Sequence, residues 1–244
     1  MKNEFIIGGW TQSLEAVPPQ SFSYAMYGMV TNFPALTTGT NDWPGWSPAK
    51  IAAPQHGACK VFWTYGGAWG LPEGTPANDT EIAEIIKATT AQNWAGVDVD
   101  NESKMNIDNI AKVMQQLKSQ GKETSYTFLA GWSFNHDGTE DSNIQKLVAG
   151  GNVDRFILMC YAGAMWSMTD IQNNVGQAIE KTISLGVETK KVILALTPAG
   201  LTQENLDYFL NQVTSHNIGG LFIWEYPSLN SADLQYICSK LGVE

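Results

Sequence analysis

The stretch Val192-Ile193-Leu194-Ala195-Leu196 is an unbroken apolar run, and Phe156-Ile157-Leu158-Met159 is another. Runs without polar alternation are typical of strands buried on both faces, as in a parallel sheet covered by helices. Each run precedes a segment with helical spacing of apolar residues, at 171–185 and at 202–216. Strand, helix and strand in this order form a βαβ unit. The sequence here therefore predicts an α/β fold with parallel strands.

The same alternation extends through the chain. Strand-like segments lie at 4–10, 22–30, 60–65, 95–100, 123–130, 155–161, 191–197 and 219–224. Helical segments lie at 82–91, 107–120, 143–149, 171–185, 202–216 and 231–241, with Thr202 and Ser231 as expected caps. Eight such units in 244 residues fit a single (β/α)8 TIM barrel, so we expect one domain over 1–244. A doubly wound sheet is the alternative, but Gly8-Gly9 does not form its GxGxxG loop.

Composition excludes several classes of protein. The chain is 43% hydrophobic and 16% charged, which disfavours disorder. Its 14 Lys and Arg against 24 Asp and Glu disfavour nucleic acid and anionic membranes as partners. No apolar run approaches the ~18 residues of a membrane span. No leader-like apolar stretch follows Met1, so a secreted mature form and a cytoplasmic protein both stay open.

No cofactor or metal is expected. The three cysteines and three histidines are widely spaced, without a ligand motif. The segment 32–58 is rich in Pro, Gly, Thr and Trp and shows no clear helix, apart from one turn at 48–53. Because it follows the second strand, it should lie at the carboxyl-terminal face of a barrel, where active sites form.

The chemistry is carried by residues 94–102, which read Trp-Ala-Gly-Val-Asp-Val-Asp-Asn-Glu. Asp98, Asp100 and Glu102 alternate, so they should share one face of a strand, and in a barrel that face is the interior. Three neighbouring carboxylates shift one another's pKa values and favour one protonated acid near neutral pH, as a general acid requires. A solvated acidic turn at a strand end is the competing interpretation.

These residues resemble glycoside hydrolase family 18, whose fourth barrel strand ends in DGxDxDxE. Gly96, Asp98, Asp100 and Glu102 match it, while Ala95 stands at its first Asp. Three further segments resemble family motifs in the matching strands. The SxGG motif of the third strand resembles Thr64-Tyr65-Gly66-Gly67, and the MxY motif of the sixth resembles Met159-Cys160-Tyr161. The GG…W motif of the eighth strand resembles Gly219-Gly220-Leu221-Phe222-Ile223-Trp224.

The resemblance implies substrate-assisted, retaining hydrolysis of β-1,4 linkages at N-acetylglucosamine, an exception to the two-carboxylate scheme. It makes Glu102 the acid/base. Asp100 would orient the substrate's 2-acetamido group, which is the nucleophile, and Asp98 would tune Asp100 through a shared proton. Tyr161 would donate a hydrogen bond to the acetamido carbonyl, and Trp224 would form the floor of the −1 sugar site.

Other residues are candidates for substrate binding. Gly66 and Gly67 would let the chain approach the acids, and Trp10 would pack in the core or stack on sugar. Five more tryptophans lie in or beside loops after strands and could stack on sugars or anchor those loops: Trp43, Trp46, Trp69, Trp132 and Trp166.

Departures from the family pattern define the alternatives. The short segment 198–201 leaves no room for the inserted α+β domain of many chitinases, so we expect an open cleft. Together with Asn101, where many bacterial chitinases have Trp, this favours endo action on chitin-type oligomers or the chitobiose core of N-glycans. Ala95 and Ala162 keep open a catalytically silent, chitinase-like carbohydrate-binding protein (lectin, storage protein or inhibitor), whereas Glu102 disfavours it. A phosphate-binding aldolase-type barrel is disfavoured because Gly219-Gly220 lies at the wrong end of its strand.

Overall fold

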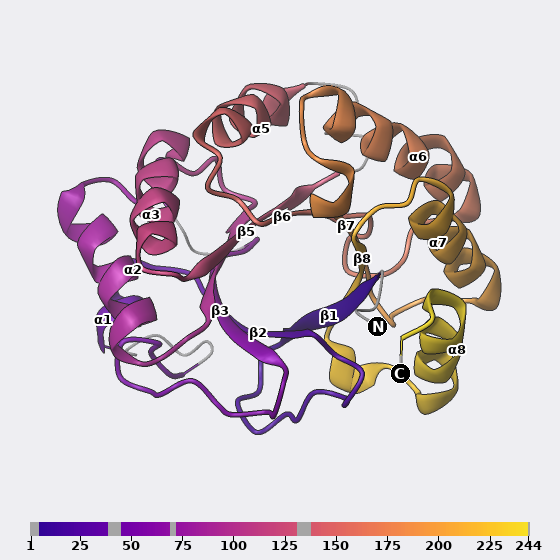
Figure 1. Cartoon of the computed structure of the whole chain (residues 1–244), viewed down its shortest axis with the longest axis horizontal. Helices are drawn as coiled ribbons and strands as arrows, with labels where there is room; N and C mark the ends of the chain where they lie inside the picture. Colours follow the sequence, from indigo (N-terminus) through magenta and orange to yellow (C-terminus); the bar gives the residue numbers. More distant parts are fainter. Residues whose placement is uncertain (1–4, 39–44, 69–71, 131–137, 244) are drawn as a thin grey trace.

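The computed structural model describes residues 5–38, 45–68, 72–130 and 138–243. Eight parallel strands close into a barrel in chain order, and β1 pairs with β8 to complete it. Helices surround most of the barrel (Figure 1). This confirms the predicted single (β/α)8 barrel.

The strands agree with the sequence prediction to within a few residues. They are β1 Ile6–Thr11, β2 Tyr24–Val30, β3 Lys60–Gly66, β4 Gly96–Asn101, β5 Glu123–Leu129, β6 Arg155–Met159, β7 Val192–Leu196 and β8 Gly220–Trp224. The two apolar runs with which the sequence analysis began lie in β6 and β7, and every residue of these strands is buried. The short connection from β7 to the next helix leaves no inserted domain there.

The helices described are α1 Phe33–Thr38, α2 Asp79–Ala91, α3 Ile107–Ser119, α5 Thr139–Gly150, α6 Met168–Ser184, α7 Gln203–Ser215 and α8 Ser231–Leu241, with 3-10 turns η1 Thr189–Lys191 and η2 Tyr226–Ser228. None of the helices in these described ranges is long and apolar enough to cross a membrane.

Three local expectations need correction or confirmation. Helix α1 was not expected; the Asn32 side chain caps it by accepting the Ala35 backbone N–H at 2.7 Å. Asn230, not Ser231, caps α8, because its side chain accepts the Asp233 backbone N–H. Thr202 caps α7 as expected and forms a capping box with Asn205.

The barrel interior is filled by large side chains and closed at its amino-terminal end by ionic groups. Arg155 is 4% exposed, and its guanidinium lies 4.1 Å from the Tyr24 ring centroid and pairs with Glu123 at 2.7 Å. Lys60 also pairs with Glu123. The opposite, carboxyl-terminal end is where the polar groups of the candidate site lie.

Candidate active site

The three acids lie on β4 and just beyond it. Asp98 pairs in register with Thr64 of β3 and Ser125 of β5, and Asp100 pairs with Gly66 and Thr127. Both aspartates are fully buried, and Glu102 follows the strand and is partly exposed. Because alternate residues of a strand share a face, Asp98 points into the barrel below Asp100.

Asp98 is held by four donors. Oδ2 accepts from Trp10 Nε1 at 2.9 Å and Thr64 Oγ1 at 3.2 Å. Oδ1 accepts from Ser125 Oγ at 2.6 Å and Thr127 Oγ1 at 2.8 Å. Burial raises the pKa of Asp98, while these donors favour the carboxylate and oppose that rise.

Asp100 is the opposite case. Neither of its oxygens has a hydrogen-bond partner among the described residues, although both are buried. Burial, then the charge of Glu102 and then that of Asp98, raises the pKa of Asp100 well above its ordinary value of 3.8. Such an unpartnered buried group in a native structure calls for a specific explanation.

Glu102 and Tyr161 complete the polar part of the site. Burial raises the pKa of Glu102 above its ordinary value of 4.5, so its carboxyl group keeps a proton to higher pH than an exposed one. Tyr161 follows β6 and is 6% exposed. Burial and the nearby charges of Asp100 and Glu102 raise its pKa well above the ordinary value, so its hydroxyl group stays protonated and can donate.

The described residues form a cleft of about 740 Å³ above these groups. It is lined by Gln12, Met29, Thr31, Gly67, Ala68, Asp100, Glu102, Leu129, Met159, Tyr161, Ala162, Gly163 and Trp224. Asp100 and Glu102 are the only charged residues in this lining. A cleft with apolar walls and a few convergent polar groups is the usual form of a small-molecule site.

Gly66, the last residue of β3, and Gly67, which follows it, play different parts in the site. A Cβ on Gly66 would lie 2.0 Å from the Asp100 carbonyl oxygen, and its φ is +120°. Gly67 lines the cleft, and its N–H donates to that same carbonyl oxygen at 3.0 Å. Gly66 therefore allows the close approach of β3 to the acidic strand.

The candidate aromatic residues do not all reach the cleft. Trp224 ends β8 and lines the cleft. Trp10 is 1% exposed, so in this structure its ring cannot stack on a sugar, and its N–H serves Asp98 instead. Trp166 packs against the hydrophobic layer outside the barrel, and Trp46 stacks on Trp94 with centroids 5.9 Å apart. The candidates that lie outside the described residues are Trp43, Trp69 and Trp132.

Sequence reasoning missed the hydroxyl groups that hold Asp98 and the apolar side chains of the cleft wall, such as Met29 and Leu129. Ser125 and Thr127 did carry a signal, because they are alternating polar residues in a buried strand. Met29 and Leu129 carried none, since an apolar residue at a strand end is usually core.

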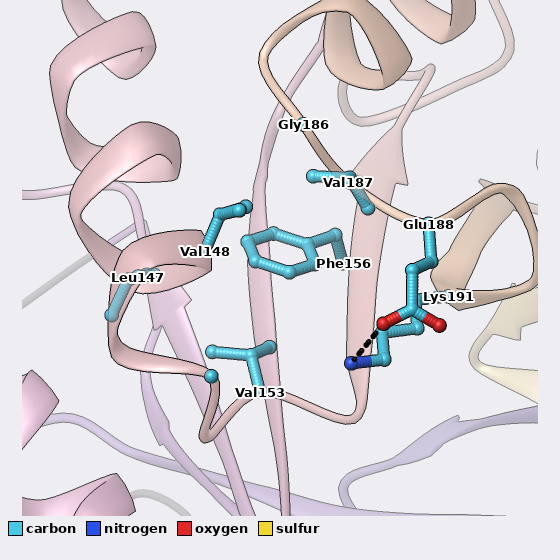
Figure 2. Close-up of a pocket in the computed structure, with 9 residues that line it drawn as sticks. Leu147, Val148, Val153, Phe156, Gly186, Val187, Glu188 and Lys191 are labelled. Carbon is cyan, nitrogen blue, oxygen red and sulfur yellow. Dashed lines mark ion pairs between the residues drawn. The ribbon is translucent and has the colours of Figure 1, made fainter.

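A second cavity, of about 80 Å³, lies between the end of α5, the start of β6 and the turn that precedes β7 (Figure 2). Phe156 lies between Val148 and Val187, and the Glu188–Lys191 ion pair lies at its side. This cavity is small, and none of the acids of the cleft lines it. Within the described ranges, no group of three or more His, Cys, Asp or Glu side chains could hold a metal ion.

Comparison with known proteins supports the same fold. No protein-family model and no curated protein sequence matches the chain. Among solved structures, a Streptomyces coelicolor protein assigned as chitinase A aligns with TM-score 0.69 and 14% identity, covering 99% of each chain. A fungal endo-β-N-acetylglucosaminidase of family 18 aligns with TM-score 0.64 and 15% identity, covering 97% of this chain and 96% of its own.

A thermostable chitinase domain from Pyrococcus furiosus, in complex with chito-oligosaccharides, aligns with TM-score 0.64 and 16% identity over 91% of this chain and 83% of its own. A Schiff-base-forming aldolase aligns less well, with TM-score 0.52 and 9% identity over 98% of this chain and 94% of its own. At these identities the comparison establishes the fold alone, a barrel that this chain shares with these chitinases and the endo-β-N-acetylglucosaminidase.

Proposed function

We propose that the protein is a retaining glycoside hydrolase that cleaves β-1,4 linkages at N-acetylglucosamine. The observation that carries this proposal is Asp100, a buried carboxyl group that lines the cleft with both oxygens unpartnered among the described residues. The 2-acetamido group of N-acetylglucosamine brings an N–H that would supply the missing partner. A neutral sugar also suits a cleft whose only charged lining residues are Asp100 and Glu102.

In the first step, Glu102 gives its proton to the glycosidic oxygen as the bond to C1 breaks. The raised pKa of Glu102 favours this acid form. The acetamido oxygen attacks C1, and the resulting oxazolinium ion carries the positive charge. Asp100 accepts the acetamido N–H and, as a carboxylate, stabilises that charge. Both the N–H and the developing positive charge favour this ionised form, against the burial that raises the Asp100 pKa in the free protein.

In the second step, Glu102 as carboxylate removes a proton from water while the water oxygen attacks C1. The acetamido oxygen leaves C1 on the opposite face, so two inversions retain the anomeric configuration. The Tyr161 hydroxyl group donates a hydrogen bond to the acetamido oxygen in both steps and keeps its proton. Trp224 lies under the apolar face of the −1 sugar, where an aromatic ring packs well.

The structural relatives support the choice of substrate. One was solved with chito-oligosaccharides and another is an endo-β-N-acetylglucosaminidase. The absence of an inserted domain between β7 and α7 favours an endo mode of cleavage, because long chains can lie across an open cleft.

The test compares a chitin tetrasaccharide with a high-mannose glycopeptide. We expect cleavage of one, no cleavage by Glu102→Gln, and a turnover lower by about 100-fold or more for Asp100→Asn, the scale of a lost transition-state contact. Proton NMR of the first product should show the β-anomer. Wild-type turnover by Glu102→Gln, or initial formation of the α-anomer, would contradict the mechanism.

A catalytically silent carbohydrate-binding protein is the second candidate. Ala95 and Ala162 favour it, since Ala95 stands at the first Asp of the family motif and Ala162 at the Asp that often follows MxY. It predicts binding of one oligosaccharide by calorimetry without any turnover by the wild-type protein. Binding that is lost in Trp224→Ala, with no product formed, would establish this alternative.

A further inference from the structure

The turn that carries Glu102 is closed by the side chain beside it. Asn101 is the last residue of β4 and is 5% exposed. Its Oδ1 accepts the Met105 backbone N–H at 2.9 Å, which closes a turn over residues 101–105. Such a side-chain bond replaces a backbone bond and fixes the path of the chain locally. Glu102 lies inside the turn that this bond closes.

The other end of the Asn101 amide is tied to the neighbouring strand and helix. Its Nδ2 donates to the Tyr126 hydroxyl at 2.7 Å and to Glu140 Oε1 at 3.3 Å. The Tyr126 hydroxyl in turn donates to Glu140 Oε2 at 2.5 Å. Tyr126 belongs to β5 and Glu140 to the first turn of α5, so a strand and a helix both hold the amide that ends β4.

Glu102 itself has no comparable restraint. No hydrogen bond or ion pair from the described residues holds its carboxyl group, whose interactions there are burial and the charge of Asp100. Its direction therefore depends on its backbone, and its backbone depends on the turn. A general acid must lie within hydrogen-bond reach of the atom that it protonates.

We propose that Asn101 is a positioning residue for Glu102: its amide, held by Tyr126 and Glu140, fixes the 101–105 turn and so directs the Glu102 carboxyl group into the cleft. The role of Glu102 as acid/base rests on the proposed function, whereas the direction of its side chain does not. Only an amide serves here, because the Met105 N–H needs an acceptor and Glu140 needs a donor. An aspartate would set a second carboxylate against Glu140.

The first test is kinetic. Asn101→Ala should lower kcat for whichever substrate is cleaved by about 10- to 100-fold, with KM within about threefold, the scale of an approximately 1 Å misplacement of a reacting group. Glu140→Ala should lower kcat in the same way. Glu140→Gln should recover part of that loss, because its single amide oxygen can still accept one of the two bonds, from Asn101 or from Tyr126.

A matched control separates positioning from stability. Thr89→Val removes a buried bond, Trp63 Nε1 to Thr89 Oγ1 at 3.0 Å, on the outer side of the barrel. It should lower the melting temperature as Asn101→Ala does while kcat stays near the wild-type value. An Asn101→Ala protein that loses stability but keeps wild-type kcat would overturn the proposal.

The second test does not need turnover. Carbon-13 NMR of glutamate-labelled protein, with the Glu102 signal assigned from Glu102→Gln, measures the pKa of Glu102 directly. In Asn101→Ala the carboxyl group should turn toward solvent, and its pKa should fall toward the ordinary 4.5. A folded Asn101→Ala protein with an unchanged Glu102 pKa would refute the positioning role. If the Glu102 pKa falls in Asn101→Ala while the wild-type protein cleaves neither substrate, the positioning role stands and the proposed hydrolase is rejected.

Discussion

Replacing either of two aspartates on β4 by alanine should change the free energy of unfolding by very different amounts. Asp98 and Asp100 are both fully buried, so Asp98→Ala and Asp100→Ala remove the same side chain from similar surroundings. Asp98→Ala leaves four donors without their acceptor. Asp100→Ala leaves none among the described residues.

The size of the difference follows from these bonds. The hydroxyl groups of Thr64, Ser125 and Thr127 can rotate toward other acceptors, but the Trp10 N–H cannot, because its ring packs edge-on against Phe222 with centroids 5.6 Å apart. A buried donor left unsatisfied costs about 1–3 kcal/mol. We therefore expect Asp98→Ala to be less stable than Asp100→Ala by about 1–3 kcal/mol at pH 7.

The stability of Asp100→Ala relative to the wild type should also depend on pH. Because the pKa of Asp100 is raised above 3.8, the folded state takes up a proton that the unfolded state releases, so this group lowers stability as pH rises through its folded value. Asp100→Ala should therefore gain stability relative to the wild type on going from acid to neutral pH.

Urea unfolding followed by tryptophan fluorescence measures both quantities, since the chain has nine Trp residues. The slope of the free energy of unfolding against urea should be the same for the two variants. Equal stabilities at pH 7, or a less stable Asp100→Ala, would refute the assignment of the hydrogen bonds.

Three further predictions concern the rest of the barrel. Glu123→Gln should lower the free energy of unfolding at pH 7 by about 2–3 kcal/mol, less than for a fully buried pair, because it weakens the bond to buried Arg155 while the Glu123 side chain is 22% exposed. Burial raises the pKa of Glu123, but the charge of Arg155 and the contacts with Lys60 outweigh it, so the pKa lies below 4.5. In urea titrations, the loss of unfolding free energy in Glu123→Gln should therefore be complete above pH 4.5 and become smaller below it. Gly66→Ala should destabilise the protein by at least about 3 kcal/mol through its collision with the Asp100 carbonyl and its positive φ, whereas Gly163→Ala, with nothing within 4 Å of its Cβ, should melt within a few degrees of the wild type.

The order of the strands could be predicted because each strand carries its own local signal. The apolar runs of β6 and β7 have no polar alternation, and every residue in them is buried as that pattern requires. Helix α1 escaped prediction because it has only six residues, too few to show a helical period, and lies in a segment rich in Pro and Thr. Short elements of this kind are stabilised by packing rather than by their own propensity.

The site was only partly predictable. Alternation along β4 predicts that the acids share a face, because that depends on one strand alone. The difference between Asp98 and Asp100 depends on which side chains of β1, β3 and β5 come opposite them, and that is set by register across the barrel. Trp10 and Asp98 are separated by 88 positions in the chain, and no local pattern relates them.

The contrast between Asp98 and Asp100 also distinguishes the structural requirement for binding a ligand from the requirement for catalysis. A barrel selected for stability alone would pair Asp100 as fully as it pairs Asp98, because an unpartnered buried carboxyl group weakens the folded state. The unpartnered Asp100 is thus the stronger indication of a ligand group, and a silent binding protein would use it as well as a hydrolase would. Catalysis requires in addition a proton donor held in one direction. Asn101 closes the turn that carries Glu102, and the Gly74 N–H also holds this turn by donating to the Lys104 carbonyl oxygen at 3.0 Å. We therefore expect loss of the Asn101 bonds to lower hydrolysis while leaving binding at Asp100 intact.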